Sequence, residues 1–572
     1  MTLTGRKSAF QFGWSFGSFR RLASCCALFA AVVSGQTTRM PPLTEVSREE
    51  GIPVTDPLVI AKCGSCHSRD ERGNMQRISW ARATPESWQS ELKQMSLVNG
   101  VSLTPPEARS MVKYLSTKHG LAPEEARPVM YDAERRIYEE TVIPNDNLRN
   151  TCAKCHAFAR VLSWRRSPVD WKQFADSHAA RYKIPPNDQA VEFLGTAAPL
   201  HTSEWEAWSA RARAPNMAGR WLVTASIKGR GDYFGEMQLD RIGDDEFSTR
   251  VNLTSVKDGS SILRSGRTTL YGGYAWRGRS SGSKPANSAP DDLSSEMREV
   301  LWITPDQSTA EGRWFWGQYQ EFGFDVKLRR ASSDPTLLVL DRSSLKTGSR
   351  SNRIRIRGDN FPAHVTPADV DFGSGVIVRG IVSSGASEVI AEVDVDAGAQ
   401  PGKRDVAFRR SVKPGAIAIY DRVDYVKVTP ESALAAFGDT THRMGYQQFD
   451  AIGYQRGPDG KLHTGDDVEL GPVDVAWSME VFYAAEGGST DFVGKVSSTG
   501  FFTPASDSPN NNFDVWVIAT ARSEKDKNGK PPVGKSYLVV TVPTYTFGGR
   551  QYFRDLDRWI DDGPAPGVEK QR

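Results

Sequence analysis

Cysteine is scarce in this sequence, and its scarcity excludes one common way of stabilising an exported chain. Six cysteines occur among 572 residues. Cys25 and Cys26 lie in an N-terminal segment with the composition of a leader, and the other four belong to two Cys-x-x-Cys-His motifs. Because no cysteine remains for a structural disulfide, we expect packed apolar cores to stabilise the folded chain.

Strong charge and long apolar runs are absent as well. The formal net charge of +3 provides no field for holding a polyanion such as nucleic acid. The run from Leu22 to Val33 is too short to span a bilayer, and no later segment is long and apolar enough for a transmembrane helix. With 39% hydrophobic and 25% charged residues, the composition is that of a globular protein. The length predicts about three to five domains.

Residues 1–35 are typical of a secretory signal peptide, because basic side chains precede the apolar run and the small residues Ser34 and Gly35 follow it. Export would place the mature chain in an oxidising compartment. Three other interpretations stay open: an uncleaved anchor, a lipoprotein signal ending at Cys25, and a twin-arginine signal at Arg20–Arg21.

The mature chain is expected to begin with a helical domain over residues 36–212. Thr104 is followed by two prolines and then by apolar residues at helical spacing, which is the pattern of a capped helix that ends near Gly120. Helices are expected at Thr104–His119, Ala133–Thr141, Pro168–Arg181 and Thr202–Arg213.

After about Met217 the pattern changes to short alternating runs separated by turn residues, which is typical of all-β domains. Strands are expected at Arg220–Ile227, Tyr233–Leu239, Glu299–Ile303, Arg353–Arg357 and Ser536–Val542. Turn clusters at Ser332–Pro335 and Thr429–Gly438 mark candidate boundaries. The sequence therefore predicts a multidomain α plus all-β chain, with a barrel-like domain over 213–332, immunoglobulin-like sandwiches over 333–430 and 431–550, and a tail over 551–572.

The helical domain contains an internal repeat, with copies over about 36–125 and 126–212. Each copy has a Cys-x-x-Cys-His motif, then (Ile/Leu)-Ser-Trp-x-Arg, then Pro-x-x-Trp, and then a distinctive residue seven positions further on. These landmarks are Trp80, Trp88 and Met95 in the first copy and Trp164, Trp171 and His178 in the second. The repeat predicts two copies of one cofactor-binding unit.

The motifs Cys63-Gly64-Ser65-Cys66-His67 and Cys152-Ala153-Lys154-Cys155-His156 predict two covalently attached haems. In such a motif both thiols form thioethers with haem vinyl groups, and the histidine binds the iron as its proximal ligand. A zinc knuckle would need both cysteine pairs in one site, and a redox Cys-x-x-Cys does not need the histidine. The attachment residues are therefore Cys63, Cys66, His67, Cys152, Cys155 and His156.

Met95 and His178 are the predicted sixth ligands of the two irons. They occupy the same position of the repeat, and thioether sulfur and neutral imidazole are common distal ligands of low-spin haem. A helix-core role for Met95 and an ordinary surface or core role for His178 are the alternatives. The competing ligands are Met75, which follows its motif too closely, Met111, which lies on an apolar helix face, His119 and His201, which are expected to face solvent, and Met130 and Met217, which are weaker.

Different sixth ligands imply different reduction potentials, since methionine raises the potential and bis-histidine ligation leaves it lower. The resulting hypothesis is that electrons enter at the His156/His178 haem and leave from the His67/Met95 haem. Two six-coordinate irons favour electron transfer over peroxidase chemistry. The four repeat tryptophans are expected to pack against the haem edges, with an electron relay as the less favoured alternative.

Carboxylates also cluster between Asp459 and Asp467, a composition suited to calcium. Because their spacing does not match an EF-hand, a polar hairpin is the favoured interpretation. The sequence contains no phosphate loop, nucleophile elbow or zinc-protease helix.

With this spacing, the two haem units and the β domains behind them resemble the alpha subunit of quinohemoprotein amine dehydrogenase. The resemblance continues at Gly231–Met237, Gly358–Pro362 and Gly471–Val475, and it covers essentially the whole mature chain. It implies a periplasmic enzyme of three subunits that oxidises primary amines to aldehyde and ammonia. A cysteine tryptophylquinone would lie in a small gamma subunit, and a seven-bladed propeller would form the beta subunit. The alpha subunit would pass electrons to a soluble cytochrome c or a small copper protein.

Cysteine usage agrees with this division of labour. With four cysteines committed to haem, the mature chain has none left for a cysteine-derived quinone, so the amine chemistry is expected on another chain. Two rival functions remain open. One is a free-standing dihaem electron carrier or peroxidase with appended β modules. The other is a haem sensor whose β domains bind a surface ligand.

Overall fold

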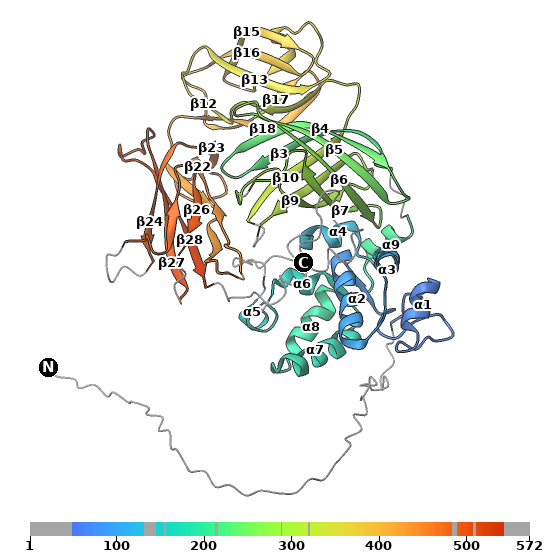
Figure 1. Ribbon diagram of the computed structural model, residues 1–572. Coiled ribbons are helices and arrows are strands. Elements are labelled where there is room, and N and C mark those ends of the chain that lie inside the picture. The colour runs from blue at the N-terminus through green and yellow to red at the C-terminus, as the bar shows by residue number, and fades with distance from the viewer. Residues whose placement is uncertain are drawn as a thin grey trace, which may run out of the picture. The chain divides into compact units, whose positions relative to one another are not determined.

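The computed structural model describes residues 49–130, 143, 145–153, 156–211, 216–287, 289–317, 321–440, 442–482, 489–506 and 511–542. Helices dominate the first part and strands the remainder, in the order that the colours of Figure 1 follow from blue to red. The expected signal peptide 1–35, the expected helix Ala133–Thr141, Cys155 and the expected tail 551–572 lie outside the described residues.

The helical part consists of nine described α-helices, one 3₁₀-helix and two short strands. The helices are α1 (Pro57–Cys63), α2 (Pro85–Asn99), α3 (Pro105–Lys118), α4 (Pro123–Ala126), η1 (Arg127–Val129), α5 (Asp146–Cys152), α6 (Phe158–Leu162), α7 (Pro168–Tyr182), α8 (Asp188–Ala197) and α9 (Ser203–Ser209), and the strands are β1 (Ala81–Ala83) and β2 (Trp164–Arg166). The helices predicted at Thr104–His119 and Pro168–Arg181 are confirmed as α3 and α7. The one predicted to reach Arg213 ends earlier, at Ser209.

Polar side chains explain where the longer helices begin. At the start of α3, the Thr104 side chain accepts from the Glu107 amide, and the Glu107 carboxylate accepts from the Thr104 amide at 2.8 Å, which completes a capping box. Thr84 and Ser167 cap α2 and α7 through their side-chain oxygens, and a proline follows each of them at the first helical position.

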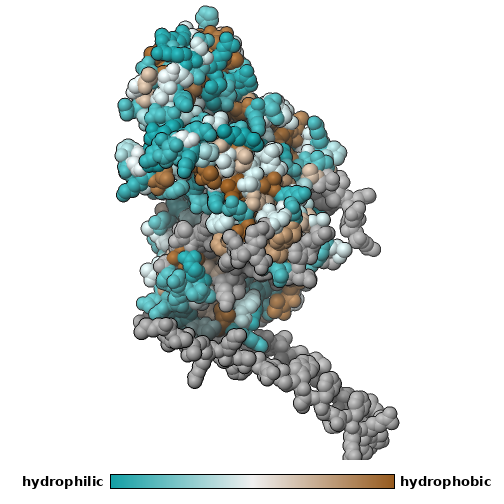
Figure 2. Space-filling view, turned by 90° about the vertical axis from the view of Figure 1, so that its left-hand side faces the viewer, coloured by the Kyte–Doolittle hydropathy of each residue, from teal (hydrophilic) through white to brown (hydrophobic). Residues whose placement is uncertain are grey.

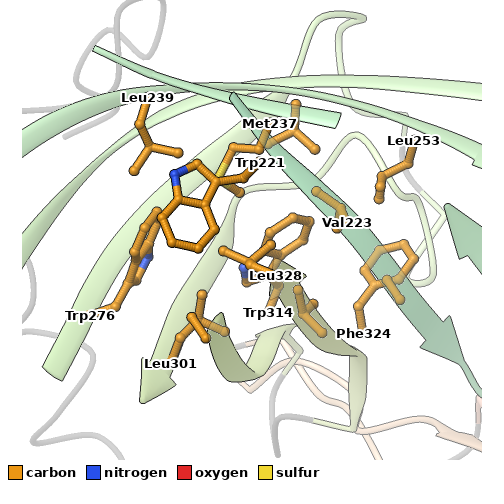
Figure 3. Close-up of a cluster of buried hydrophobic side chains, with 14 of the residues drawn as sticks. Trp221, Val223, Met237, Leu239, Leu253, Trp276, Leu301, Trp314, Phe324 and Leu328 are labelled. Carbon is orange, nitrogen blue, oxygen red and sulfur yellow. The ribbon is translucent and has the colours of Figure 1, made fainter. Parts of the chain in front are cut away.

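Eight antiparallel strands close into a barrel in the order β10-β3-β4-β5-β6-β7-β8-β9, which confirms the predicted barrel-like domain. They are β3 (Gly219–Ile227), β4 (Gly231–Arg241), β5 (Glu246–Ser255), β6 (Ser261–Tyr271), β7 (Ala275–Gly282), β8 (Met297–Ile303), β9 (Thr309–Trp316) and β10 (Phe322–Arg330). Alternate side chains point inward, and the buried rings of Trp221, Trp276 and Trp314 converge there (Figure 3). The barrel interior is therefore a packed core.

Two four-stranded sheets follow the barrel, in the orders β11-β13-β16-β15 and β12-β18-β17-β14. Their strands are β11 (Thr336–Leu340), β12 (Ser344–Lys346), β13 (Asn352–Asp359), β14 (Val370–Asp371), β15 (Val376–Gly385), β16 (Glu388–Val395), β17 (Gly402–Phe408) and β18 (Ser411–Tyr420), with a 3₁₀-helix η3 at Pro367–Asp369. Side chains of both sheets, among them Ile354, Val393 and Phe408, share one buried cluster, so the sheets pack as a sandwich.

The remaining strands form three sheets, in the orders β19-β22-β23, β20-β28-β27-β24 and β21-β26-β25. They are β19 (Tyr425–Thr429), β20 (Ser432–Ala436), β21 (Gln447–Gln448), β22 (Asp450–Gln455), β23 (Val468–Pro472), β24 (Val475–Val481), β25 (Gly494–Val496), β26 (Phe501–Pro504), β27 (Phe513–Ala521) and β28 (Val533–Thr541). A single cluster that includes Phe449, Phe502 and Val517 is buried between them.

The prediction that Thr429–Gly438 is a turn cluster is wrong. The segment contains β20, which pairs in parallel with β28 and buries Ala435 in the apolar cluster that includes Phe449. The strand before it, β19, pairs with β22. The residues of β20 are small and apolar and alternate only weakly with polar residues, so the sequence did not indicate a strand. A parallel partner strand far along the chain stabilises them as a strand.

Buried hydrogen bonds connect the helical part to the barrel. The Tyr274 hydroxyl donates to the Leu121 carbonyl at 2.9 Å, and the Trp302 indole N–H donates to the Pro123 carbonyl at 3.0 Å. Both rings belong to the same apolar cluster as the inner faces of α2 and α3. The haem-motif part therefore rests on the barrel through a continuous core.

A buried carboxylate adds an ionic contact at the same junction. Glu86, in the first turn of α2, forms ion pairs with Arg277 and Arg298 of the barrel. Burial raises the pKa of Glu86, but the two guanidinium groups outweigh that effect, and the pKa lies below its ordinary value of 4.5.

Figure 2 shows hydrophilic side chains predominating over the sandwich at the top of that view, with apolar residues scattered among them. Scattered apolar residues are ordinary on a solvated face. Within the described residues, no helix has the length and apolar character needed to cross a membrane.

We predict that Glu86→Gln destabilises the chain by roughly 3–5 kcal/mol at neutral pH, because it leaves two arginines without their buried partner. A carboxylate with a lowered pKa stabilises the fold above its unfolded-state pKa and loses that effect as the pH falls through the folded-state value. The deficit should therefore shrink in acid. Urea unfolding at several pH values tests this.

The matched control is Glu246→Gln, which removes a partly exposed ion pair with Lys113 across the same junction. It should cost no more than about 1 kcal/mol. Equal losses for the two variants, or a Glu86→Gln deficit that does not change with pH, would contradict the account.

Candidate haem sites

Each Cys-x-x-Cys-His motif begins at the end of a helix. The first cysteine, Cys63, is the last residue of α1, and Cys152 is the last residue of α5. After α1, the amides of Cys66 and His67 both donate to the Cys63 carbonyl, at 3.1 and 2.8 Å. This tight turn gathers the two thiols and the imidazole of the first motif, as attachment of one haem requires. Among the described residues, Cys63, Cys66 and Cys152 form no disulfide.

The two histidines predicted as proximal ligands are held in the same way. His67 Nδ1 lies 2.9 Å from the Gln76 carbonyl oxygen, and His156 Nδ1 lies 3.1 Å from the Ala157 carbonyl oxygen. A carbonyl only accepts hydrogen bonds, so Nδ1 carries a proton, and in the neutral ring Nε2 is the nitrogen with the lone pair. This is the tautomer with which an imidazole binds iron.

The second unit brings its two predicted iron ligands next to each other. The ring centres of His156 and His178 are 6.3 Å apart, at an interplanar angle of 75°. A metal–imidazole bond of about 2.0–2.1 Å places the ring centre about 3.1–3.2 Å from the metal, so two imidazoles on opposite sides of one ion have centres about 6.2–6.4 Å apart. The separation of the two ring centres therefore matches the one that an iron between two imidazoles requires.

The surroundings keep these imidazoles neutral. Burial and then the positive charge of Arg160 lower the pKa of His156 to about 4. Burial followed by the charges of Arg160 and Arg181 lowers the pKa of His178. A neutral imidazole is the form that donates a lone pair to a metal. Phe174, one turn earlier on α7, stacks on His178 with ring centres 5.7 Å apart and orients it.

Met95 lies on α2, partly exposed, at the position that corresponds to His178 on α7. Its sulfur accepts a hydrogen bond from Asn99 Nδ2 at 3.3 Å. That contact orients the thioether near the last turn of the helix. Within the described residues Met95 makes no direct contact with His67. Its assignment as a ligand therefore depends on its position on α2 alone.

The two units share more than their motifs. The Trp88 indole N–H donates to the His119 carbonyl at 2.8 Å, and the Trp171 indole N–H donates to the Ala198 carbonyl at 2.9 Å. Both bonds join a helix that carries a predicted sixth ligand, α2 or α7, to the end of the following helix, α3 or α8. Trp88 and Trp171 are buried, whereas Trp80 and Trp164 are only partly buried.

Strands β1 and β2 join the two units. They pair antiparallel with Arg82 opposite Arg165, and each strand leads directly into the cap of a helix that carries a predicted sixth ligand. The Thr84 amide donates to the Ser163 carbonyl at 3.1 Å, and the Ser167 amide donates to the Trp80 carbonyl at 3.3 Å. The pairing therefore fixes where both helices start.

A buried ionic network surrounds this pairing, and sequence reasoning missed it. Arg82 is fully buried and binds the Glu125 carboxylate with two hydrogen bonds of 2.7 and 2.9 Å. Arg165 lies 3.4 Å from the same carboxylate. Burial raises the pKa of Glu125, but both arginines lower it below its ordinary value. Arg82, the arginine of the first Ser-Trp-x-Arg repeat, was the available signal. Arg165 occupies the variable position of the second copy, and nothing in the sequence pointed to Glu125 as the shared partner.

Two competing histidines are placed differently from expectation. His119, predicted to face solvent, has no exposed surface and packs between Trp88 and Tyr114. Burial lowers its pKa to about 4. The polar helix end around it is covered by α2 and β1, which sequence reasoning did not anticipate. His201 is only partly exposed, and its Nε2 lies 2.7 Å from the Glu50 carbonyl.

The competing methionines Met75, Met111 and Met217 are buried within apolar clusters, and Met130 packs against one. Asp459–Asp467 lies in the connection between β22 and β23, which pair as a hairpin. Asp467 there accepts hydrogen bonds from the amides of Gly457 and Thr464, as a polar hairpin loop does. Across the part of the chain that the structure describes, no three His, Cys, Asp or Glu side chains are grouped to hold a metal ion.

Comparisons with known proteins match this architecture piece by piece. Residues 54–190 match the family model for quinohemoprotein amine dehydrogenase A, alpha subunit, haem binding. Residues 214–331, 334–421 and 426–548 match the models for domains II, III and IV of the same alpha subunit. The four matches follow one another in the order of the helical part, the barrel and the two sets of sheets.

Solved structures are similar only at a low level. A redesigned β-barrel matches at 14% identity and a TM-score of 0.17, over 20% of this chain and 92% of that chain. A SusE-like polysaccharide-binding protein from Bacteroides thetaiotaomicron matches at 9% identity and a TM-score of 0.12, over 54% of each chain. The comparison with curated proteins finds no match.

We predict that His178→Ala opens the sixth position of one haem and leaves the other unchanged. About half of the haem should become high-spin and bind carbon monoxide when reduced, because the lost imidazole leaves an open iron position. Visible spectra of the purified protein, with and without carbon monoxide, measure both changes. His201→Ala is the control, since it removes a histidine of the same part of the chain. A parent-like spectrum for His178→Ala would contradict the assignment.

Proposed function

The chain belongs to the family of quinohemoprotein amine dehydrogenase alpha subunits, and we propose that it carries electrons through two covalently bound haems from a quinone on a partner subunit to a soluble carrier. The observation that carries this proposal is the His156–His178 pair, whose ring separation of 6.3 Å fits an iron held on both sides. An iron closed on both sides has no position for substrate, which suits electron transfer.

The residues of this chain hold and tune the haems. Cys63 and Cys66 attach the first haem, with His67 as proximal ligand and Met95 as distal ligand. Cys152 and Cys155 attach the second haem, with His156 as proximal ligand and His178 as distal ligand. When bound, each haem supplies one-electron chemistry. The Gln76 and Ala157 carbonyls orient the proximal imidazoles, and Phe174 orients His178.

The amine chemistry belongs to other subunits in this proposal. The two haem motifs together use all four cysteines outside the leader, so this chain has none left for a cysteine tryptophylquinone. The quinone would lie on a small gamma subunit beside a propeller-shaped beta subunit, where primary amines are oxidised to aldehyde and ammonia. The leader supports a periplasmic location, where a cytochrome c or a small copper protein accepts the electrons.

We expect mass spectrometry of the purified chain to show two covalent haem additions. Adding a primary amine to the isolated chain should not reduce these haems, because the quinone is elsewhere. The same amine should reduce them in the intact complex. Reduction of the isolated chain by amine would show that the amine chemistry does not depend on another subunit. A single haem addition would contradict the proposal of two haems.

The two haems should differ in reduction potential, with the His67/Met95 haem the higher. Met95→His should lower the potential of the first haem alone, and His178→Met should raise that of the second alone. Spectroelectrochemical titration resolves the two steps. The proposed direction of flow, from the second haem to the first, is contradicted if the His178 site titrates at the higher potential.

A further inference from the structure

We propose that Trp164 is the side chain through which an electron passes between the two haem units, a role that rests on the two-haem function proposed above. Trp164 lies on β2, at the pairing that joins the units. It packs against the apolar cluster that contains Trp88 and also against the one that contains Trp171. Its side chain therefore belongs to both units at once.

On the side of the first unit, Trp164 meets a ligand-bearing helix directly. Its ring contacts that of Trp88 edge to face, with centres 5.1 Å apart at 68°. Trp88 lies on α2 seven residues, or two turns, before Met95. Residues at that spacing share one face of a helix, so Trp88 and Met95 face the same side.

On the side of the second unit, a stack of planar groups leads from Trp164 to the distal ligand. The Arg166 guanidinium lies 4.3 Å from the centre of the Trp164 ring and 4.9 Å from the centre of the Phe174 ring. Phe174 in turn stacks on His178. Packed groups thus connect His178 to Trp88 without a break, and Trp164 is the member that crosses between the units.

The ring of Trp80, the repeat partner of Trp164, lies elsewhere. Its indole N–H donates to the Glu49 carbonyl at 3.0 Å, and the ring packs against Gly51 at the start of the described chain. Trp80 meets the other unit through its backbone carbonyl, which accepts from the Ser167 amide, whereas Trp164 contacts the Trp88 ring with its own ring. Trp80 therefore offers a matched control.

The step itself moves one electron from a reduced iron of one haem to the oxidised iron of the other, and no bond forms or breaks. Trp164 is not oxidised on the way. The guanidinium of Arg166 is buried over its ring and forms an ion pair with Asp170 on another side. A guanidinium held over the ring face disfavours removal of an electron from the indole. The Trp164 side chain fills the space between the two units with closely packed atoms. Electronic coupling would fall steeply across a void in the same place.

The test compares Trp164→Leu with Trp80→Leu in the intact three-subunit complex. After a short pulse that reduces one haem, transient absorption follows transfer to the other. We expect Trp164→Leu to slow interhaem transfer several-fold and Trp80→Leu to leave it within the error of the parent. Trp164→Phe, which keeps an aromatic ring in the gap, should retain most of the rate.

Potentials and spectra of both haems separate this proposal from the function on which it rests. If both haems of Trp164→Leu keep parent spectra and potentials and transfer still proceeds at the parent rate, the role of Trp164 is wrong and the two-haem function stands. Equal slowing by Trp164→Leu and Trp80→Leu would also overturn it. If the parent complex shows only one low-spin haem, the proposed function itself fails.

Discussion

The pairing of β1 with β2 is the constraint on which both candidate haem units depend. It is short, with three residue pairs, yet each strand ends at the cap of the helix that bears a distal-ligand candidate. A shift of one residue in this pairing would move side chains to the opposite face of the strands. It would also reorient the first turns of α2 and α7. The ionic group of Arg82, Arg165 and Glu125 is buried around the pairing and opposes such a shift, since it would leave charges unpaired in the core.

The barrel gives this arrangement a rigid base. Its interior is filled by large aromatic rings, and it meets the helical part through buried hydrogen bonds and the Glu86 ion pairs. A filled barrel deforms little, so the helices that it supports keep their positions. The proposed electron transfer would benefit from such a base, because the separation of the two haems would stay constant. In this proposal the helical part holds the haems, and the barrel supports it.

Much of this could be predicted from local sequence. The Cys-x-x-Cys-His motifs, the capped helix after Thr104, the alternating β runs and the repeat that equates Met95 with His178 depend on residues close together in the chain, and the barrel and the helices α3 and α7 are confirmed. What could not be predicted depends on distant partners. The burial of His119 and the pairing of Arg82 with Glu125 arise only when β1 meets β2 and α4. The strand β20 needs β28, about one hundred residues later, to form.

Low-temperature electron paramagnetic resonance of the fully oxidised, haem-loaded protein tests the central claim most directly. The claim is that the repeat builds two closed but unequal iron sites, one with histidine and methionine and one with two histidines. The account predicts two low-spin ferric signals of equal intensity, with different g values that correspond to these two ligand sets. A single type of low-spin signal, or a substantial high-spin signal from an open iron, would contradict it.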